Sequence, residues 1–284
     1  RRCKVPFVIR VGANYDKIFE TTKRPIEKNL FMFRFVEKQI ERFVFSRADL
    51  VAGANENNLR FALANGAKKN KSTLFRYGNL IDKRHFLSPN KRGQGHIKIF
   101  KSLNIKENSF LIYVGRLEPV KRPYDVLCAF NKIHNTEKDL KLLLVGDGSQ
   151  REYLETLAIK NKIDHKVIFT GNMTQKWLSL VLPKARAVLS PHTGRALSEA
   201  ALSASPIIAY DIDWQSELIE TGITGELVNY GDIEGMVKAL NKILCKPSYS
   251  LQIGNKAREK TFNMMNPQLL NKHEIKQYEI LLEG

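Results

Sequence analysis

The stretch Ser190-Pro-His-Thr-Gly-Arg-Ala-Leu-Ser-Glu-Ala-Ala-Leu-Ser-Ala-Ser-Pro-Ile-Ile-Ala-Tyr210 spans one strand–helix–strand transition. Residues 185–189 are mostly apolar and predict a buried strand, which the Pro-His-Thr-Gly turn ends. An Ala- and Leu-rich helix is expected from Arg195, and residues 206–209 predict a second buried strand. Strands joined through a helix run parallel, so this unit predicts an α/β fold with a parallel sheet.

The start of that helix is a candidate binding site. The backbone N–H groups of Gly194, Arg195, Ala196 and Leu197 open the helix, and N–H groups at a helix start attract anions. Glu199 follows about one helical turn later, so its carboxylate is expected to face the same cleft. This pattern favours a ligand with a phosphate for the N–H groups and with sugar or ribose hydroxyls that donate to Glu199.

The same alternation continues on both sides of this unit. Buried strands are predicted at residues 110–114, 140–145, 167–170, 185–189, 206–209 and 225–228. Helices are predicted at residues 123–134, 150–160, 175–182, 195–203, 214–220, 233–244 and 267–282. Nearly continuous apolar strands between helices predict a complete doubly wound parallel sheet, whose ligands bind beyond the carboxyl ends of the strands.

The first part of the chain is less regular. Strands are predicted at residues 5–11, 49–53 and 71–77, and helices at residues 30–46 and 55–65. A polar segment with glycines at residues 89–95 is the predicted linker. The domain prediction is therefore residues 1–88 for a first domain, 89–95 for the linker, 96–262 for a second domain and 263–284 for a carboxy-terminal helix. Because the chain opens directly into a strand, we expect the first domain to be truncated.

The composition is that of a globular protein with a strong basic excess. The 284 residues are 43% hydrophobic and 26% charged, and no apolar run reaches the length of a membrane span, so a cytoplasmic location is expected. The formal net charge of +17 suits nucleic acid, an anionic membrane or acidic ligands. The lysines are spread along the chain without a recognition motif, so nucleic acid is not expected. Helix 30–46 is amphipathic and basic, which favours packing on a sheet first and peripheral docking at the inner face of a membrane second.

Two cations follow the first strand of the second domain. In Tyr113-Val-Gly-Arg-Leu-Glu-Pro-Val-Lys121, Gly115 ends the strand and Arg116 and Lys121 lie in the loop after it. Two cations beside a helix start neutralise a diphosphate and stabilise the charge that grows on it as a leaving group. The alternative interpretation is a solvated surface pair.

The next two strands also end in glycines. Gly146 and Gly148 form a Gly-x-Gly turn that lacks the third glycine of the dinucleotide-binding motif, so an NAD-dependent dehydrogenase is not favoured. Gly171 and Asn172 follow the third strand, where main-chain groups can meet the edge of a base.

The order of these motifs, Gly-Arg-Leu-x-Pro-x-Lys, Val-Gly-Asp-Gly, Phe-x-Gly, Leu-x-Glu-Ala and Pro-Ile-Ile-Ala, resembles the retaining glycosyltransferases of the GT-B group. The resemblance covers residues 110–244 and implies two Rossmann-like domains. It implies that the first domain contacts the acceptor, that the second binds a nucleotide-diphospho-sugar, and that the carboxy-terminal helix crosses back to the first domain. It also implies transfer of a sugar to a glycan or lipid-linked acceptor with retained configuration and without an obligatory metal or other cofactor.

The resemblance assigns roles residue by residue. Arg116 and Lys121 are expected to hold the donor diphosphate as catalytic residues, and Glu199 to hold the ribose. Residues that would bind the rest of the donor are Gly115, Gly146, Gly148, Gly171, Asn172, His192, Gly194, Arg195, Ala196 and Leu197.

One position departs from the family pattern. Pro191 stands where relatives carry a glutamate that contacts the donor sugar. His192, Asp211 or Asp213 takes over that contact, or the donor is recognised differently, or activity is lost. A non-catalytic nucleotide-sugar-binding module is therefore the alternative function, and a basic nucleic-acid-binding protein is the third.

Overall fold

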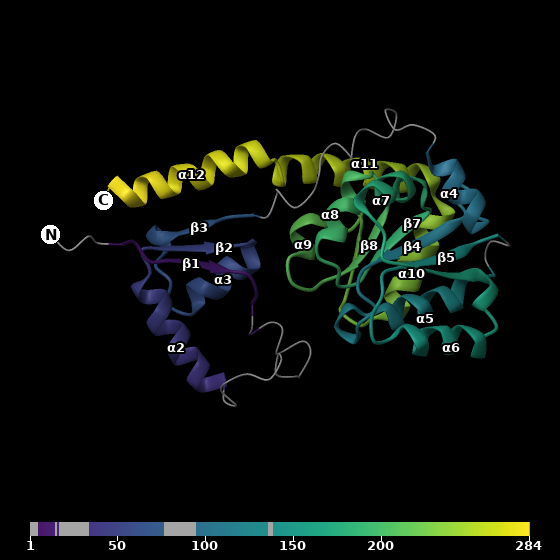
Figure 1. Cartoon of the computed structure of the whole chain (residues 1–284), viewed down its shortest axis with the longest axis horizontal. Helices are drawn as coiled ribbons and strands as arrows, with labels where there is room; N and C mark the ends of the chain where they lie inside the picture. The colour runs from purple at the N-terminus through teal and green to yellow at the C-terminus, as the bar shows by residue number, and fades with distance from the viewer. Residues whose placement is uncertain (1–4, 15, 17–33, 77–94, 136–138, 284) are drawn as a thin grey trace. The chain divides into compact units, whose positions relative to one another are not determined.

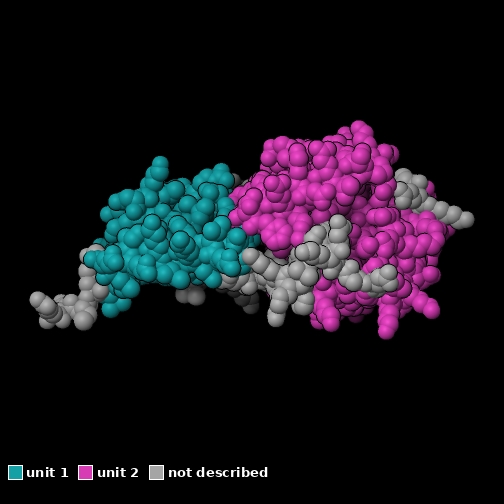
Figure 2. All heavy atoms as spheres, turned by 90° about the horizontal axis from the view of Figure 1, so that it is seen from above, with its two compact units in different colours: residues 1–79, 265–284 teal, residues 80–264 magenta. Residues whose placement is uncertain are grey.

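The computed structural model describes residues 5–14, 16, 34–76, 95–135 and 139–283. The chain divides into two compact units, residues 1–79 with 265–284 (unit 1) and residues 80–264 (unit 2), coloured teal and magenta in Figure 2. The predicted linker at residues 89–95 lies outside the described residues except for Gly95. Residues 30–33 of the predicted amphipathic helix also lie outside them.

Unit 1 is built on a three-stranded parallel sheet in the order β1-β2-β3. Its strands are β1 (Val8–Val11), β2 (Leu50–Gly53) and β3 (Ser72–Leu74). Its helices are α2 (Arg34–Arg47), α3 (Glu56–Ala64) and α12 (Pro267–Glu283). Strands β1 and β3 are shorter than the predicted strands at residues 5–11 and 71–77. Asn55 caps the start of α3, because its side chain accepts a hydrogen bond from the Asn58 N–H at 2.8 Å.

Successive residues of β2 point to opposite faces of this sheet and so build two cores. Val51 packs in a cluster with Phe45 of α2 and Phe61 of α3. Leu50 and Ala52 face Tyr278 and Leu281 of α12 on the other side. Helix α12, yellow in Figure 1, thereby covers the second face of the sheet.

Unit 2 is a six-stranded sheet in the order β6-β5-β4-β7-β8-β9, with every pair of neighbours parallel. Its strands are β4 (Phe110–Val114), β5 (Lys141–Val145), β6 (Val167–Gly171), β7 (Ala187–Ser190), β8 (Ile207–Tyr210) and β9 (Glu226–Val228). Its helices are α4 (His96–Leu103), α5 (Pro123–Ile133), α6 (Arg151–Lys160), α7 (Gln175–Val181), α8 (Arg195–Leu202), α9 (Gln215–Leu218), α10 (Ile233–Cys245) and α11 (Pro247–Met264). The predicted doubly wound parallel sheet is confirmed.

Both faces of this sheet are buried. Leu111 and Tyr113 of β4 belong to one core with residues of α5, α6 and α10, whereas Phe110 and Ile112 belong to another with residues of α4, α7 and α8. Figure 1 shows helices on both sides of the sheet. Strands buried on two sides must be apolar throughout, which explains the continuous apolar runs. The chain leaves β4 toward β5 on one side and returns through β7 on the other, so the ligand cleft is expected between β4 and β7.

Three helices differ from the predictions. Helix α4 and helix α11 were not predicted, and α9 is a single turn instead of residues 214–220. Helix α11 buries mostly small side chains, among them Gly254, where an added Cβ would lie 2.2 Å from the Ala204 carbonyl oxygen. Close packing through small residues leaves no apolar periodicity for the sequence to reveal.

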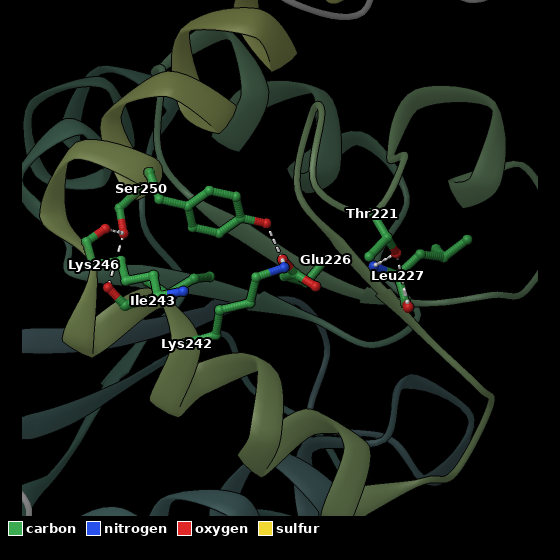
Figure 3. Close-up of polar contacts among 8 residues, drawn as sticks. Thr221, Glu226, Leu227, Lys242, Ile243, Lys246 and Ser250 are labelled. Atoms are coloured by element: carbon green, nitrogen blue, oxygen red, sulfur yellow. Dashed lines mark hydrogen bonds and ion pairs between the residues drawn. The ribbon is translucent and has the colours of Figure 1, made fainter.

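The edge strand β9 is covered by its own chain, as Figure 3 shows. The Thr221 hydroxyl accepts from the Leu227 N–H at 3.0 Å and donates to the Leu227 carbonyl at 3.3 Å. Next to it, the Glu226 carboxylate accepts from Lys242 of α10 at 2.6 Å and from Tyr249 of α11. These contacts fix β9 to both helices that follow it.

Candidate active site

Three loops join at the carboxyl ends of β4, β5 and β6. The Gly115 N–H donates to the Val145 carbonyl, and the Gly146 N–H donates to the Gly171 carbonyl, each at 2.9 Å. Gly146 and Gly148 have φ angles of +134° and +159°. An added Cβ would lie 1.9 Å from the Gly115 oxygen at the first position and 2.6 Å from the Leu117 oxygen at the second. Glycine is therefore required at both, because the backbones of two loops touch there.

The loop after β4 carries both predicted catalytic cations. Arg116 is exposed, and Lys121 is half-buried at the end of the 3₁₀ turn η4 (Pro119–Lys121). The loop is tied to its neighbour by a hydrogen bond from the Leu117 N–H to the Asp147 carbonyl at 2.9 Å. Burial lowers the pKa of Lys121, the nearby positive charge of Arg116 lowers it further, and Asp213 opposes both effects. The structure thus places the two cations close enough to repel.

The side chain of Gln215 stabilises the turn after β7, and Gln215 was not among the predicted site residues. Its buried amide accepts from the Thr193 N–H at 3.1 Å and donates toward the carbonyls of Ser190 at 3.1 Å and Pro191 at 3.0 Å. It also approaches the Tyr210 carbonyl at 2.8 Å. No pattern in the sequence marks Gln215, because its partners lie up to 25 positions away.

His192 links this turn to the loop after β4 at residues 115–121, which carries Arg116 and Lys121 and is called the cation loop below. Its Nδ1 lies 2.9 Å from the Val120 carbonyl oxygen, which only accepts hydrogen bonds, so Nδ1 carries the proton and Nε2 is the acceptor in the neutral ring. Burial, followed by the positive charge of Lys121, lowers the pKa of His192 to about 4, although the hydrogen bond to Val120 acts in the other direction. His192 therefore stands beside Lys121 as a neutral imidazole.

Glu199 is buried on α8 with an exposed fraction of 2%. It accepts from Gln175 Nε2 of α7 at 3.0 Å and pairs with Arg195 Nε at 3.2 Å. Burial raises its pKa, and the charge of Arg195 opposes that shift. The described contacts of Glu199 are thus to Arg195 and Gln175. Gln175 was not among the predicted site residues, and Arg195 was predicted to meet the donor only through its backbone.

The remaining predicted parts of the site are the start of α8 and the loop after β6, which was predicted to meet the edge of the donor base. Gly194 is exposed and precedes α8, and an added Cβ there would meet no atom within 4 Å. The Leu197 N–H donates to the Gly194 carbonyl at 3.1 Å, so it is used within the first turn of the helix. Gly171 has φ +70°, and Asn172 beside it is exposed. Among the described residues, no group of three or more His, Cys, Asp or Glu side chains is placed to hold a metal ion.

The chain matches a known protein family over much of unit 2. A family described as glycosyl transferases group 1 matches residues 96–260, which is more than half of the chain. The chain belongs to this family. Every candidate site residue named above lies within the matched range, and the predicted resemblance is confirmed at the level of the family.

Two curated relatives match the chain at moderate identity. The N-acetyl-alpha-D-glucosaminyl L-malate synthase of Bacillus anthracis is 29% identical over 84% of this chain and 62% of its own length. A glycogen synthase of Mycobacterium tuberculosis is 27% identical over 53% of this chain and 37% of its own length. The chain therefore spans less than two thirds of either relative.

A solved structure shares the fold. Anabaena HepE in complex with UDP and glucose aligns with a TM-score of 0.77 at 17% identity, over 96% of this chain and 71% of that one. This likeness supports the predicted GT-B architecture, with Rossmann-like parallel sheets.

Proposed function

We propose that this group 1 glycosyl transferase binds a nucleotide-diphospho-sugar at the carboxyl ends of β4 and β7 and transfers the sugar to a glycan or lipid-linked acceptor. The observation that carries the proposal is that Arg116 and Lys121 lie on the same loop after β4, which a hydrogen bond from the Leu117 N–H to the Asp147 carbonyl holds to the loop after β5. Asp213 already acts on Lys121 through its charge, and a bound diphosphate would in addition neutralise both cations.

Each group has a chemical task in this proposal. Arg116 and Lys121 stabilise the charge that develops on the diphosphate when the sugar–phosphate bond breaks. The turn at residues 194–196 meets the donor phosphate and sugar through its backbone, and Glu199 accepts from the ribose hydroxyls. The cations supply the positive charge that the leaving group needs, so no obligatory metal is proposed. Retention of configuration rests on the resemblance to GT-B enzymes.

His192 is the proposed contact to the donor sugar where relatives have a glutamate. Its fixed tautomer presents an acceptor at Nε2 beside Lys121, which suits a sugar hydroxyl. Asp213 also acts on Lys121 through its charge and is the second candidate. If neither group orients the sugar, the alternative function is donor binding without transfer.

We expect one class of nucleotide-sugar to raise the melting temperature in a panel of UDP-, GDP- and ADP-sugars. At about 100 times its dissociation constant, a ligand of the native state stabilises it by about 2.7 kcal/mol. UDP-glucose is the first compound to test, because the HepE structure holds UDP and glucose. Release of the nucleoside diphosphate from the same donor then separates transfer from binding alone. A panel without any shift contradicts the proposal.

We also propose peripheral contact of helix α2 with an anionic membrane, on the cytoplasmic side. Phe35 and Phe43 are 73% and 56% exposed, and Ile40 is 43% exposed on the same helix. Lys38 and Arg42 lie between them in the sequence, and the guanidinium of Arg47, one turn later, lies 3.9 Å from the centre of the Phe43 ring. Apolar and basic side chains on one surface helix suit the interface of an anionic bilayer. None of the helices in the described part of the chain is long and apolar enough to cross one.

Replacing Phe35 and Phe43 together by serine is expected to weaken binding to phosphatidylglycerol-containing vesicles about tenfold or more, because two aromatic rings no longer enter the interface. Co-sedimentation measures the bound fraction. Ile159→Ser is the matched control, since Ile159 is 65% exposed on α6. Equal binding by the double variant, or equal binding to neutral vesicles, contradicts the membrane proposal.

A further inference from the structure

We propose that Tyr113 is a positioning residue that sets the distance between the two cations of the donor site. This inference rests on the proposed function and adds a residue to it. Tyr113 lies on β4 with no exposed surface, and its ring packs in the core beneath α5 and α10. Its hydroxyl emerges from that core directly under the loop at residues 115–121.

The hydroxyl bridges the two ends of the loop. It donates to the Arg116 carbonyl at 2.8 Å and lies 3.4 Å from the Lys121 carbonyl oxygen. An added Cβ at Gly115 would lie 2.8 Å from the same hydroxyl, so the absence of a side chain there is what admits the phenol. One buried group thus contacts the backbone of both cationic residues.

The two cations of the loop act on each other through their charges. The positive charge of Arg116 lowers the pKa of Lys121, and the charge of Asp213 opposes that effect. Burial raises the pKa of Tyr113 above its usual value, so the phenol keeps its proton and remains a donor. A bridge between the two carbonyls holds the cations at one spacing before the diphosphate binds, which reduces the cost of ordering them at binding.

The test is Tyr113→Phe, which keeps the ring and removes only the hydroxyl. UDP and uridine are the probes, and calorimetry measures both dissociation constants. We expect UDP to bind about fivefold more weakly to the variant and uridine to bind equally well, because only the diphosphate meets the cations. Tyr249→Phe is the matched control, since it removes a phenol hydroxyl bonded to Glu226 at the sheet edge.

A purely structural role for Tyr113 predicts a different result. In that case Tyr113→Phe lowers the melting temperature as Tyr249→Phe does, and the ratio of the UDP and uridine dissociation constants stays unchanged. That result overturns the inference. A double variant with Arg116→Ala provides a second measurement: the loss of the hydroxyl should weaken UDP binding less in that background. If the unmodified protein binds UDP no better than uridine, the proposed diphosphate site itself is wrong.

Discussion

Replacing Lys121 by alanine is expected to lower kcat/KM for the donor about 100- to 1,000-fold with little change in melting temperature. Lys121 is the less hydrated of the two cations, because it is half-buried while Arg116 is exposed. Its attraction to a diphosphate is therefore less screened by water and salt. Its loss removes charge stabilisation at the step in which the leaving group departs.

Initial rates with the donor that gives the largest thermal shift measure this effect. Lys98→Ala is the control, because Lys98 is an exposed lysine on α4, outside the cation loop. If the unmodified protein binds the donor without turning it over, the dissociation constant of that donor is the quantity to compare. A Lys121→Ala protein that keeps the rate and affinity of the unmodified protein shows that the cation loop is not the diphosphate site.

Gly146→Ala is expected to destabilise the protein by about 3 kcal/mol or more, a fall in melting temperature on the order of 10 °C. The new Cβ would lie 1.9 Å from the Gly115 carbonyl oxygen, and the residue would keep a φ of +134°. Relief of that clash separates the loops after β4 and β5, so donor affinity should fall with stability.

Gly171→Ala is the matched comparison on the neighbouring strand. Its φ of +70° is also in the left-handed region, but an added Cβ would meet no atom within 4 Å. Only backbone strain of about 1–2 kcal/mol is expected there. Thermal unfolding of both variants distinguishes strain from close approach, and equal losses would contradict the claim that the two loops touch at Gly146.

The sequence allowed the fold of unit 2 to be predicted where burial is two-sided. Strands such as β4 and β8 are apolar at every position, because helices cover both faces of the sheet, and their positions were predicted to within a residue or two. Helix α11 was missed because it packs through small side chains such as Gly254 and Ala257. Its pattern is therefore one of size and not of hydrophobicity.

The candidate site was also predictable only in part. The glycines and the two cations were predictable, because a strand that ends in Gly-Arg or Gly-Asp-Gly identifies a loop at the carboxyl edge. The polar supports were not predictable. Gln215 and Gln175 act through hydrogen bonds to residues more than 20 positions away. Their roles exist only once the chain has folded.

The hydroxyl of Thr221 has a consequence for assembly. Growth of a β-sheet from one molecule into another requires free donors and acceptors along an outer strand. Leu227 is the middle residue of the edge strand β9, and both its N–H and its carbonyl are hydrogen-bonded to the Thr221 hydroxyl. A strand from another molecule would have to displace the Thr221 hydroxyl before it could pair with Leu227. Thr221 therefore opposes extension of the sheet into another molecule at β9.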